Sequence, residues 1–569
     1  MLAELILATT LFAPQAPQGV VINELSYDDS STDDFEFIEL YNGSANNVDI
    51  TGWTLTEEDG SSASGNVHVI AGTILAPGQF WVIGMVGVPN VNETLSYSLE
   101  NGPDGVFLSD ATGVYQDGVA WEMQNWLNPI PSWLEGDGLG GDIQLHEHGG
   151  MFQNSISRGI DGFDTDDNGC DFRPAPWTPG TLNILGMTTV MPYRNNFDGP
   201  VGNDVTNDFT FSFVSGNIVD PTSLAVPVPA SPQGGNCAVW HDPSGGGNAN
   251  WLNNFTQSDY LLESYVYLAG PNALFDLDDG EHWTMGVRGH SDSFGEYQNI
   301  GGFHGVVNCT TTQSGHTGIA WVCNRTQLTA ELFLVDFNNG AGALAGGDFT
   351  VLAGPINIQA GVNDGWQRIR LCVQGTSVVG NFGGNYGCDD GQRFTASTNT
   401  VCANGAYLTY RECVTSNLDL LPLMTDGLFI GDCTTATTTP VGTGSPSSIG
   451  TPTISAPAPI IGDAGFAINV GGLIPGGAPF SGIILSTGTA LPGVPVPGGP
   501  ATALLYVSPT IVNIGMANAA GDASFGVPLP CTPMLMGQNL LAQGFDWDAT
   551  LPFALPVGLS QGLIMTLGY

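Results

Sequence analysis

The stretch VVINELSYDDSSTDDFEFIELYNGSANNVDITGWTL, residues 20–55, decides the fold, because its pattern is that of β-structure throughout. Apolar residues begin a first strand, a polar run makes a loop, and an alternating second strand leads to a turn at Asn42-Gly43. The alternation predicts that Glu36 and Glu39 stay near water. Three apolar side chains of the second strand are predicted to face a core: Phe35, Phe37 and Leu40.

Both ends of residues 19–183 carry motifs of one family. INEL, FIELYN and VDITGWTL stand near the start, and SISRGIDGFDTDDNGCDFRPAPWTPGTLN occupies residues 155–183. Together these motifs resemble the bacterial lamin tail domain. The resemblance implies an immunoglobulin-like β-sandwich in an exported protein, and it implies no reaction.

Composition excludes several classes of function. The chain of 569 residues has 80 Gly, 37 Pro and 11% charged residues, against roughly 25% in an average globular protein, which predicts short strands and tight turns. Its 54 acidic residues face nine basic ones, all Arg, for a net charge of −45. The absence of Lys excludes a Walker-type phosphate loop and a pyridoxal Schiff base, and no C-x-x-C-H motif supports haem attachment. We therefore expect no nucleotide, haem or pyridoxal cofactor and no nucleic-acid partner, whereas cations such as calcium are attracted.

The beginning of the chain indicates export. Residues 1–18 resemble a signal-peptide core, although no Lys or Arg precedes the apolar run. The alternatives are a start further upstream or an apolar first strand. No later stretch has the roughly 20 apolar residues that a membrane span needs. With the cysteines and the Gly-rich composition, this predicts an extracellular or cell-surface protein.

The strongest metal candidate is DGFDTDDNGCD, residues 161–171. Asp164, Asp166 and Asn168 match the first three ligand positions of a calcium loop, and Asp171 adds a carboxylate. The Glu that closes such loops is missing, so a hydrogen-bonded loop that caps the sandwich is the alternative. DLDDGEH supplies a second candidate, either a calcium site or an acidic turn, with Asp276 and Asp278.

Residues 193–433 form a second predicted domain that is rich in aromatic strands. The pattern W-x-R-I-x-L-x-V-x-G-x-x-V at residues 366–378 has YLLESYVYL before it and GLFIGD after it. This arrangement is similar to laminin-G and concanavalin-like jelly rolls. The resemblance implies two stacked antiparallel sheets.

Cysteines are concentrated in the second domain. Eight of the ten fall there, and an even set in an exported domain predicts a disulfide framework whose pairing stays open. The simplest pairs join neighbours across hairpins: Cys309 with Cys323, and Cys402 with Cys413. Two cysteines lie in the outer domains and are predicted to stay free: Cys170 and Cys531.

The last part of the chain changes character. Residues 434–452, TTATTTPVGTGSPSSIGTP, are predicted to form a flexible, solvated linker. The third domain, residues 453–569, has short apolar strands between Pro and Gly turns. Its segment PMLMGQNLLAQ, residues 533–543, resembles part of a C-terminal β-sandwich of secreted planctomycete-type proteins. This domain contains no Glu, His, Lys or Arg, so catalysis is not expected there.

A strand at residues 260–268 offers the best candidate for a ligand site. Its outward side chains are aromatic with an acid beside them, and such surfaces suit shallow carbohydrate sites. The alternative is that its tyrosines pack against a second sheet. The predicted site residues are Glu263, Tyr265, Tyr267, Trp283 and Arg288.

No enzyme motif appears in the chain: neither the E-x-D-x-x-E of laminarinase-like jelly rolls nor the G-x-S-x-G elbow. We expect an all-β protein of three β-sandwich domains, namely an immunoglobulin-like lamin tail domain, a concanavalin-like jelly roll and a C-terminal β-sandwich, without catalytic activity. Its expected function is to bind an extracellular glycan or cell-surface component through the jelly roll, with calcium as a candidate structural ion. Two alternatives stay open: a self-assembling subunit of an extracellular layer or filament, and a glycoside hydrolase or lyase with an unrecognised acid pair.

Overall fold

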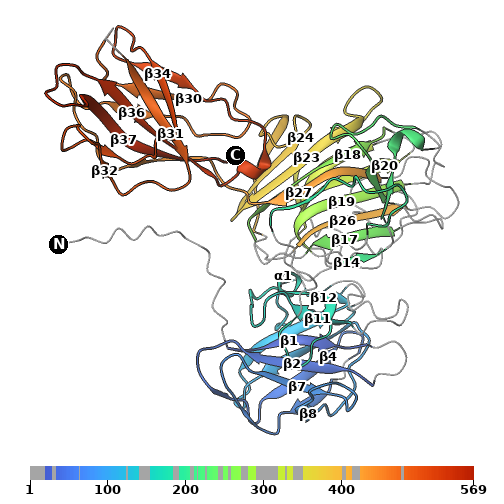
Figure 1. The fold of residues 1–569 in the computed structure, drawn as a ribbon. Coiled ribbons are helices and arrows are strands. Elements are labelled where there is room, and N and C mark those ends of the chain that lie inside the picture. The colour runs from blue at the N-terminus through green and yellow to red at the C-terminus, as the bar shows by residue number, and fades with distance from the viewer. Residues whose placement is uncertain are drawn as a thin grey trace.

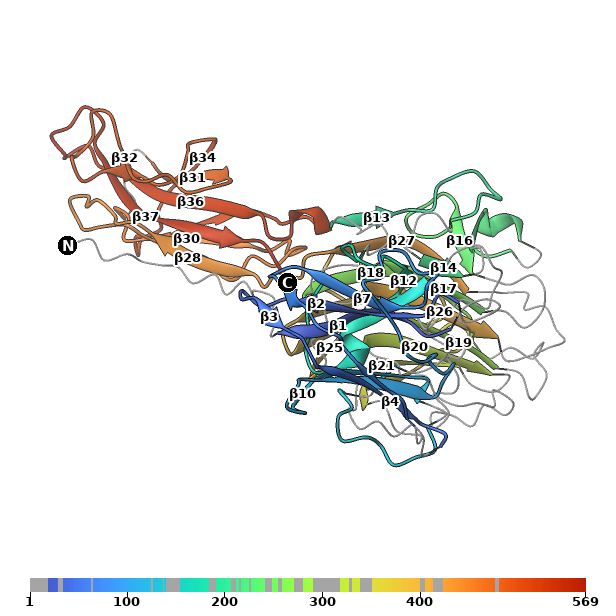
Figure 2. The ribbon, with the colours of Figure 1, turned by 90° about the horizontal axis from the view of Figure 1, so that it is seen from below.

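The computed structural model consists of β-strands and tight turns gathered into three bodies that follow one another along the chain (Figures 1 and 2). Among the described residues the helical elements are the four-residue α1 and short 3-10 turns, so the expected all-β class is confirmed. In the same part of the chain, no helix has the length and apolarity that crossing a membrane requires. The structure describes residues 19–28, 34–62, 65–123, 126–136, 138–139, 154–183, 191–205, 211–213, 216–224, 227–240, 248–253, 258–270, 280–289, 318–326, 330–337, 350–399, 405–412, 423–475 and 480–569.

The N-terminal body is a sandwich of two sheets with a shared apolar core, and all their strand pairs are antiparallel except β7 with β8. β11 pairs with β1, so the two motif-bearing ends of residues 19–183 lie side by side in one sheet. In spatial order the first sheet contains β12 (Phe172–Pro176), β11 (Asn154–Arg158), β1 (Val20–Ser26), β2 (Phe37–Asn42), β7 (Phe80–Gly84) and β8 (Glu93–Thr94). The second contains β10 (Tyr115–Trp121), β9 (Asp104–Ser109), β4 (Thr54–Asp59) and β5 (Val67–Val69). The remaining elements are the pair β3 (Val48–Asp49) and β6 (Ile74–Leu75), and α1 (Asn168–Asp171).

The predicted division of β2 into core and water faces is wrong. Leu40 packs between the sheets as expected, whereas Phe37 packs on the opposite face, against Val82 and the Trp177 ring. That face is also buried, because the segment after β12 returns across it. Alternation along a strand therefore separates two buried faces here.

Glu39 on β2 and Glu36 just before it are both buried, which corrects the prediction that they stay near water. Glu36 accepts a hydrogen bond from the Leu99 amide at 2.8 Å. Glu39 accepts from the Asn23 side chain at 2.9 Å and from the Gly180 amide at 2.6 Å. Burial without a cation raises the pKa of Glu39 to about 9.

The second body is a two-sheet sandwich whose aromatic core lies between the sheets. In spatial order the first sheet contains β15 (Gly216–Val219), β16 (Cys237–Trp240), β27 (Leu423–Gly431), β18 (Tyr260–Leu268), β23 (Gly365–Gln374), β24 (Ser377–Phe382) and β25 (Gln392–Ser397), with β13 (Tyr193–Asn195) on β27. The second contains β14 (Phe211–Phe213), β17 (Asn248–Asn253), β26 (Gly405–Glu412), β19 (Gly280–Gly289), β20 (Ile319–Thr326), β21 (Ala330–Asp336) and β22 (Thr350–Asn357). A 3-10 turn, η3, covers Pro221–Ser223.

The third body begins earlier than predicted. Thr437–Val441 forms β28, which pairs with β37, so residues assigned to a flexible linker belong to the sandwich. In spatial order its larger sheet contains β28, β37 (Val557–Thr566), β36 (Asn539–Trp547), β31 (Ser481–Thr487) and β34 (Ile511–Gly515). The smaller sheet contains β29 (Thr453–Ser455), β30 (Ala467–Gly471) and β35 (Ala523–Gly526). The pair β32 (Val494–Pro495) and β33 (Leu504–Leu505) and the 3-10 turn η4 (Pro533–Leu535) complete it.

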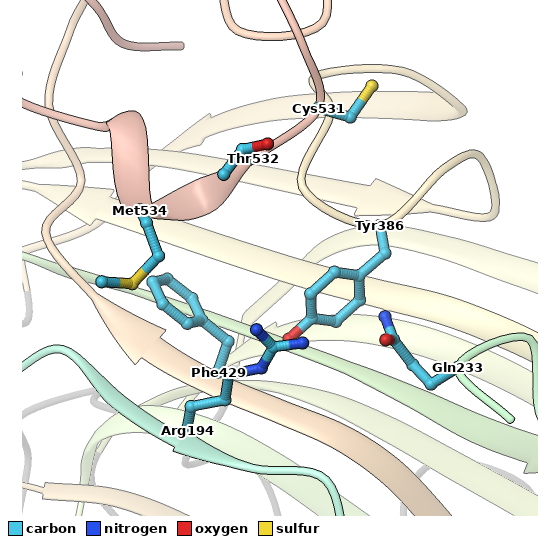
Figure 3. A pocket seen from close by; sticks show the side chains of 7 residues that line it. All are labelled: Arg194, Gln233, Tyr386, Phe429, Cys531, Thr532 and Met534. Carbon is cyan, nitrogen blue, oxygen red and sulfur yellow. The ribbon is translucent and has the colours of Figure 1, made fainter. Parts of the chain in front are cut away.

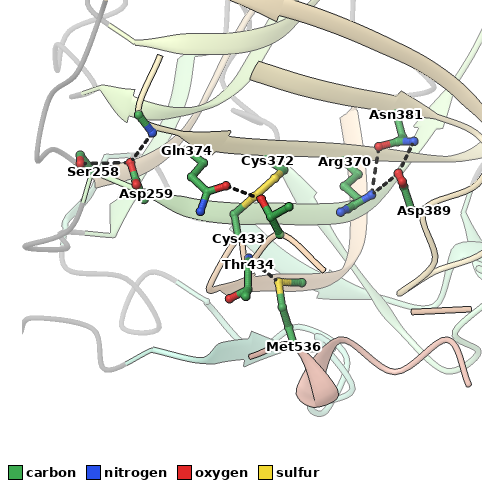
Figure 4. The surroundings of a disulfide bond; sticks show 12 residues. Ser258, Asp259, Arg370, Cys372, Gln374, Asn381, Asp389, Cys433, Thr434 and Met536 are labelled. Carbon is green, nitrogen blue, oxygen red and sulfur yellow. Dashed lines mark hydrogen bonds and ion pairs between the residues drawn. A yellow bond between two sulfur atoms is a disulfide. The ribbon is translucent and has the colours of Figure 1, made fainter. Parts of the chain in front are cut away.

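Two disulfides lie where the third body meets the second, and one of them joins the two bodies. Cys372 on β23 is bonded to Cys433, where the chain leaves β27 (Figure 4), with Cα atoms 5.6 Å apart. Cys388 is bonded to Cys531 across the two bodies, with Cα atoms 4.8 Å apart. The prediction that Cys531 stays free is therefore wrong, because folding brings it to a distant loop.

Of the other cysteine predictions, one is corrected and two stay untested. Cys170 is disulfide-bonded, which also corrects its assignment as free. The two hairpin pairs predicted within the second domain stay predictions, because three of their members lie outside the described residues: Cys309, Cys402 and Cys413.

Candidate ligand site between the second and third domains

Glu263 lies in the interior and is fully buried. It sits on β18, facing away from the core between the sheets. Its Oε1 accepts a hydrogen bond from the Gly387 amide at 2.9 Å and lies 3.4 Å from a terminal nitrogen of Arg368. Burial raises the pKa of Glu263, although Arg368 and Arg370 oppose the shift. This carboxylate holds the loop after β24 against the sheet.

Trp283 and Arg288 are placed by β19 away from any open surface. Trp283 is packed in the core between the two sheets, with 3% of its surface exposed. Arg288 is fully buried and pairs with Asp259 at 2.9 Å. Neither side chain offers a face to a molecule in solution.

Two of the three tyrosines of β18, Tyr265 and Tyr267, lie on its outer face, and each contacts a second aromatic ring. Tyr265 stacks on Tyr386 with ring centroids 5.8 Å apart. Tyr267 meets Trp366 edge-on at 5.5 Å. Of the predicted site residues, Tyr265 is thus the one in contact with a residue, Tyr386, that lines a cavity described below.

The third domain docks on this outer face of the jelly roll. Leu261 and Phe429 share an apolar cluster with Met536 of the third domain. The Arg370 guanidinium lies 3.2 Å from the centroid of the Tyr569 ring, a cation–π contact between the domains. The contact is therefore a packed interface in addition to the Cys388–Cys531 disulfide.

A cavity of about 260 Å³ opens at the edge of this interface (Figure 3). One side belongs to the jelly roll and the other to the loop around η4 in the third domain. Its lining combines two aromatic rings, a cation, an amide and a hydroxyl. The lining residues are Arg194, Gln233, Tyr386, Phe429, Cys531, Thr532 and Met534.

Tyr386 is held rigidly at the cavity wall. Its hydroxyl donates a hydrogen bond of 2.6 Å to the carbonyl of Gly427. Gly427 has φ +61°, and a Cβ there would lie 2.9 Å from Cγ of Gln233 and 3.4 Å from the Tyr386 ring. A glycine is thus required for both lining side chains to approach β27. Burial raises the pKa of Tyr386 well above its ordinary value, so the hydroxyl remains a donor.

Arg194 is the cation of the cavity. It extends from β13 and is exposed, and its Nε donates to Asn196 at 3.0 Å. Among the described residues no ion pair engages its terminal amino groups, and no carboxylate lines the cavity. Figure 3 shows the guanidinium group directed into the space that Tyr386 and Gln233 border. In a chain with 54 acidic residues, this leaves hydrogen-bond donors available to a ligand.

Sequence reasoning missed this cavity. Tyr386 sits in the irregular segment NFGGNYGCDD, which has no strand period, and Arg194 is separated from it by most of the domain. The one available signal was Cys388, two residues after Tyr386, because a loop cysteine can fix a neighbouring domain.

The loop predicted to bind calcium is built around an arginine. Arg158 is fully buried and donates to both oxygens of Asp117, at 2.9 and 2.8 Å. It also lies 3.0 Å from Asp171 and 3.4 Å from Asp164. Burial opposes its charge, but the pairs with Asp117 and Asp171 outweigh that cost and raise the pKa of Arg158.

The other predicted calcium ligands face different partners. Asn168 is buried and hydrogen-bonds to Gly118, Ala120 and Glu135 through its side chain. Asp166 is exposed, with φ +57°. The second predicted calcium site, Asp276 and Asp278, lies outside the described residues.

A different acidic group in the N-terminal domain has metal-like spacing. Oxygens of Asp117, Glu135 and Asp164 lie within 4.8 Å of one another, and three carboxylates so placed can hold a metal ion. Two of the three already contact Arg158. Burial and the neighbouring acids raise the pKa of Glu135 to about 10, so a proton on Glu135 relieves the remaining repulsion.

Comparison with known proteins supports the interpretation of the N-terminal domain. A family model described as the Lamin Tail Domain matches residues 13–122, which form most of the first sandwich. No curated protein matches the chain.

Solved structures show only distant similarity. They include the CBM2 module of the evolved Dit of Lactobacillus casei BL23 phage J-1, at 9% identity over 42% of this chain and 93% of that chain, with a TM-score of 0.24. Lectin II from Ulex europaeus has 8% identity over 39% and 97%, with a TM-score of 0.23. The exoplasmic/lumenal domain of VIP36 in a Ca2+/Man2-bound form has 7% identity over 34% and 76%, with a TM-score of 0.22. At TM-scores this low, nothing about a ligand of this chain follows.

Proposed function

We propose that this chain is an extracellular or cell-surface binding protein without catalytic activity, and that it holds a carbohydrate in the cavity between its second and third domains. The chemistry of the lining carries the proposal. Tyr386 and Phe429 supply aromatic carbon for C–H contacts with a sugar ring, and Arg194, Gln233 and Thr532 supply polar groups for its hydroxyls.

The absence of turnover is supported by the same lining. General acid–base catalysis on a glycosidic bond needs a pair of carboxyl groups on either side of it. Among the described residues that line the cavity there is no Asp, Glu or His. Glu263 is the nearest carboxylate of the predicted site, and it is buried in contact with Arg368. We therefore favour binding over a glycoside hydrolase or lyase.

Calcium is not required by this proposal. In the N-terminal loop, Arg158 supplies the positive charge that a calcium ion would supply to Asp164 and Asp171. We propose that the loop is held by this guanidinium, with the Asp117, Glu135 and Asp164 group as the remaining place where a cation can add to it.

The test is ligand binding by matched arginine variants. The disulfide-bonded full chain is screened on a glycan array, and each binding glycan is titrated calorimetrically against Arg194→Ala and Arg393→Ala. Arg393 is the control, since it is also exposed and lies on the same domain, but it pairs with Asp389 and does not line the cavity. We expect Arg194→Ala to weaken binding about tenfold or more, as for the loss of a hydrogen bond from a charged donor, and Arg393→Ala to bind normally.

Three results would overturn the proposal: no glycan binding, equal effects of the two variants, or release of reducing ends from a polysaccharide by the purified chain. The last result would establish an enzyme.

A further inference from the structure

The edge strand β34 of the third domain has an unusual surface. Ile511, Val512 and Ile514 are 59%, 51% and 56% exposed, and Met516 just beyond the strand is 80% exposed. Neighbouring residues of a strand point to opposite faces, so both faces of β34 are apolar and open to solvent. Figures 1 and 2 place the strand on the rim of the third domain.

The backbone of this strand is paired on one side only. β34 is the last strand of its sheet and pairs with β31 from Ile511 to Gly515. Among the described residues, no other hydrogen bond engages Ile511–Met516. An edge strand turns half of its N–H and C=O groups outward, and these groups accept a further strand.

The usual devices that protect an edge are missing from β34. Natural edges carry charges, Pro or a bulge, and Ile511–Met516 reads IVNIGM with an unbroken register to β31. Residues 464–521 contain no Asp, Glu, Lys, Arg or His. At the opposite edge of the same sheet, β28 carries Pro440, which lacks an N–H. The two edges of the sheet are therefore not equivalent.

We infer that β34 pairs with β34 of a second copy of this chain, in an antiparallel arrangement about a two-fold axis. Placing Asn513 opposite its counterpart sets Val512 opposite Ile514 twice, so the uncharged strand is complementary to itself. Pairing β34 with β28 would instead build an open filament, and Pro440 disfavours that geometry. A closed dimer with a ten-stranded shared sheet is the outcome.

Charge points to a second copy as the occupant. Of the 54 acidic residues, four lie in residues 434–569: Asp463, Asp522, Asp546 and Asp548. Two copies that each carry −45 repel one another least where this charge is absent. A basic partner would have no acidic side chain to pair with at β34. An uncharged strand of the same sequence can pair with it without any charge repulsion.

Sedimentation velocity of the disulfide-bonded full chain tests the inference, from about 0.1 to about 100 µM, the range of weak and moderate interfaces. We expect the mass to rise from 59.3 kDa toward twice that value. The double variant Val512→Lys and Ile514→Lys should remain a monomer, because opposed lysines in the paired strands repel. Val86→Lys, at a residue that is 88% exposed in the N-terminal domain, is the matched control and should associate normally.

The inference fails if the wild-type chain stays monomeric over this range, if the double variant dimerises equally, or if Val86→Lys also abolishes association. Far-UV circular dichroism checks that the double variant is folded. Flotation with phosphatidylcholine vesicles identifies the rival occupant, since lysine-sensitive vesicle binding by a monomeric chain would assign β34 to a membrane surface. None of these measurements depends on glycan binding, so this inference can fail independently of the proposed function.

Discussion

The first and third domains are both β-sandwiches with apolar cores, yet they bury ionisable side chains to different extents. The N-terminal domain encloses Arg158 and Asp117 together with further buried carboxyls such as those of Glu39 and Asp104. The third domain has an apolar core and four aspartates in all. In the N-terminal domain, buried charges need specific partners, and they therefore fix the arrangement of the side chains around them. In the third domain, little charge is present to oppose association with another copy of the chain.

This difference predicts which kinds of substitution and which changes of pH alter the stability of each domain. Removing one partner of a buried ion pair strands the other in a medium of low dielectric constant, which is costly. An apolar core loses stability in proportion to the contacts removed and responds little to pH. Changes of charge and pH should therefore act mainly on the N-terminal domain.

The largest expected effect is that of Arg158→Met. The change leaves Asp117 and Asp171 buried without their cation, and we expect the N-terminal domain to lose about 3 to 5 kcal/mol of unfolding free energy. Hydrogen–deuterium exchange of the full chain measures this in peptides from β1, with peptides from β36 as an internal reference. Arg393→Met, at an exposed arginine whose partner Asp389 keeps a second ion pair with Arg370, should cost about 1 kcal/mol or less. Unchanged protection of β1 would show that the arginine network is dispensable.

An intermediate effect is expected from pH. Burial raises the pKa of Glu24 to about 7 and that of Glu39 to about 9. A carboxyl whose pKa is raised on folding stabilises the fold fully below its unfolded pKa, and this contribution is lost as pH rises through the folded value. The unfolding free energy of the N-terminal domain should thus fall between about pH 5 and pH 9, by an amount on the order of a few kcal/mol.

The same hydrogen–deuterium exchange experiment measures the pH effect. Peptides of the third domain serve as the reference that corrects for the dependence of the intrinsic exchange rate on pH. Glu39→Gln keeps a hydrogen-bond acceptor for Asn23 and Gly180 but cannot ionise, so its pH slope should be shallower. A slope that is equal in the variant, or stability that increases with pH, would contradict the assigned burial of Glu39.

The smallest expected effect is that of a chelator. Because Arg158 already neutralises Asp164 and Asp171, calcium removal with EGTA should leave the melting temperature of the N-terminal domain unchanged. Differential scanning calorimetry with and without added calcium measures this. A decrease of several degrees that calcium reverses would instead assign an ion to the Asp117, Glu135 and Asp164 group.

The local sequence pattern was sufficient to predict part of the candidate site. Period-two alternation and turn residues predicted β18 and the outward direction of Tyr265, because these depend on neighbours in the chain. It could not show that Tyr265 lies beneath Tyr386, or that Trp283 faces the interior between two sheets. Those facts depend on which segments pack over each strand, and those segments are far away in sequence.

By itself the sequence determined the β class, the lamin tail resemblance and the lack of charge in the third domain, since each follows from composition or from short-range spacing. Only the tertiary structure decided that Glu36 and Glu39 are buried, that Arg158 occupies the centre of the predicted calcium loop, and that Cys531 reaches Cys388. The physical reason is burial: whether a polar side chain meets water, a counter-charge or another domain is set by the segments that fold over it, and a strand's own period carries no record of them.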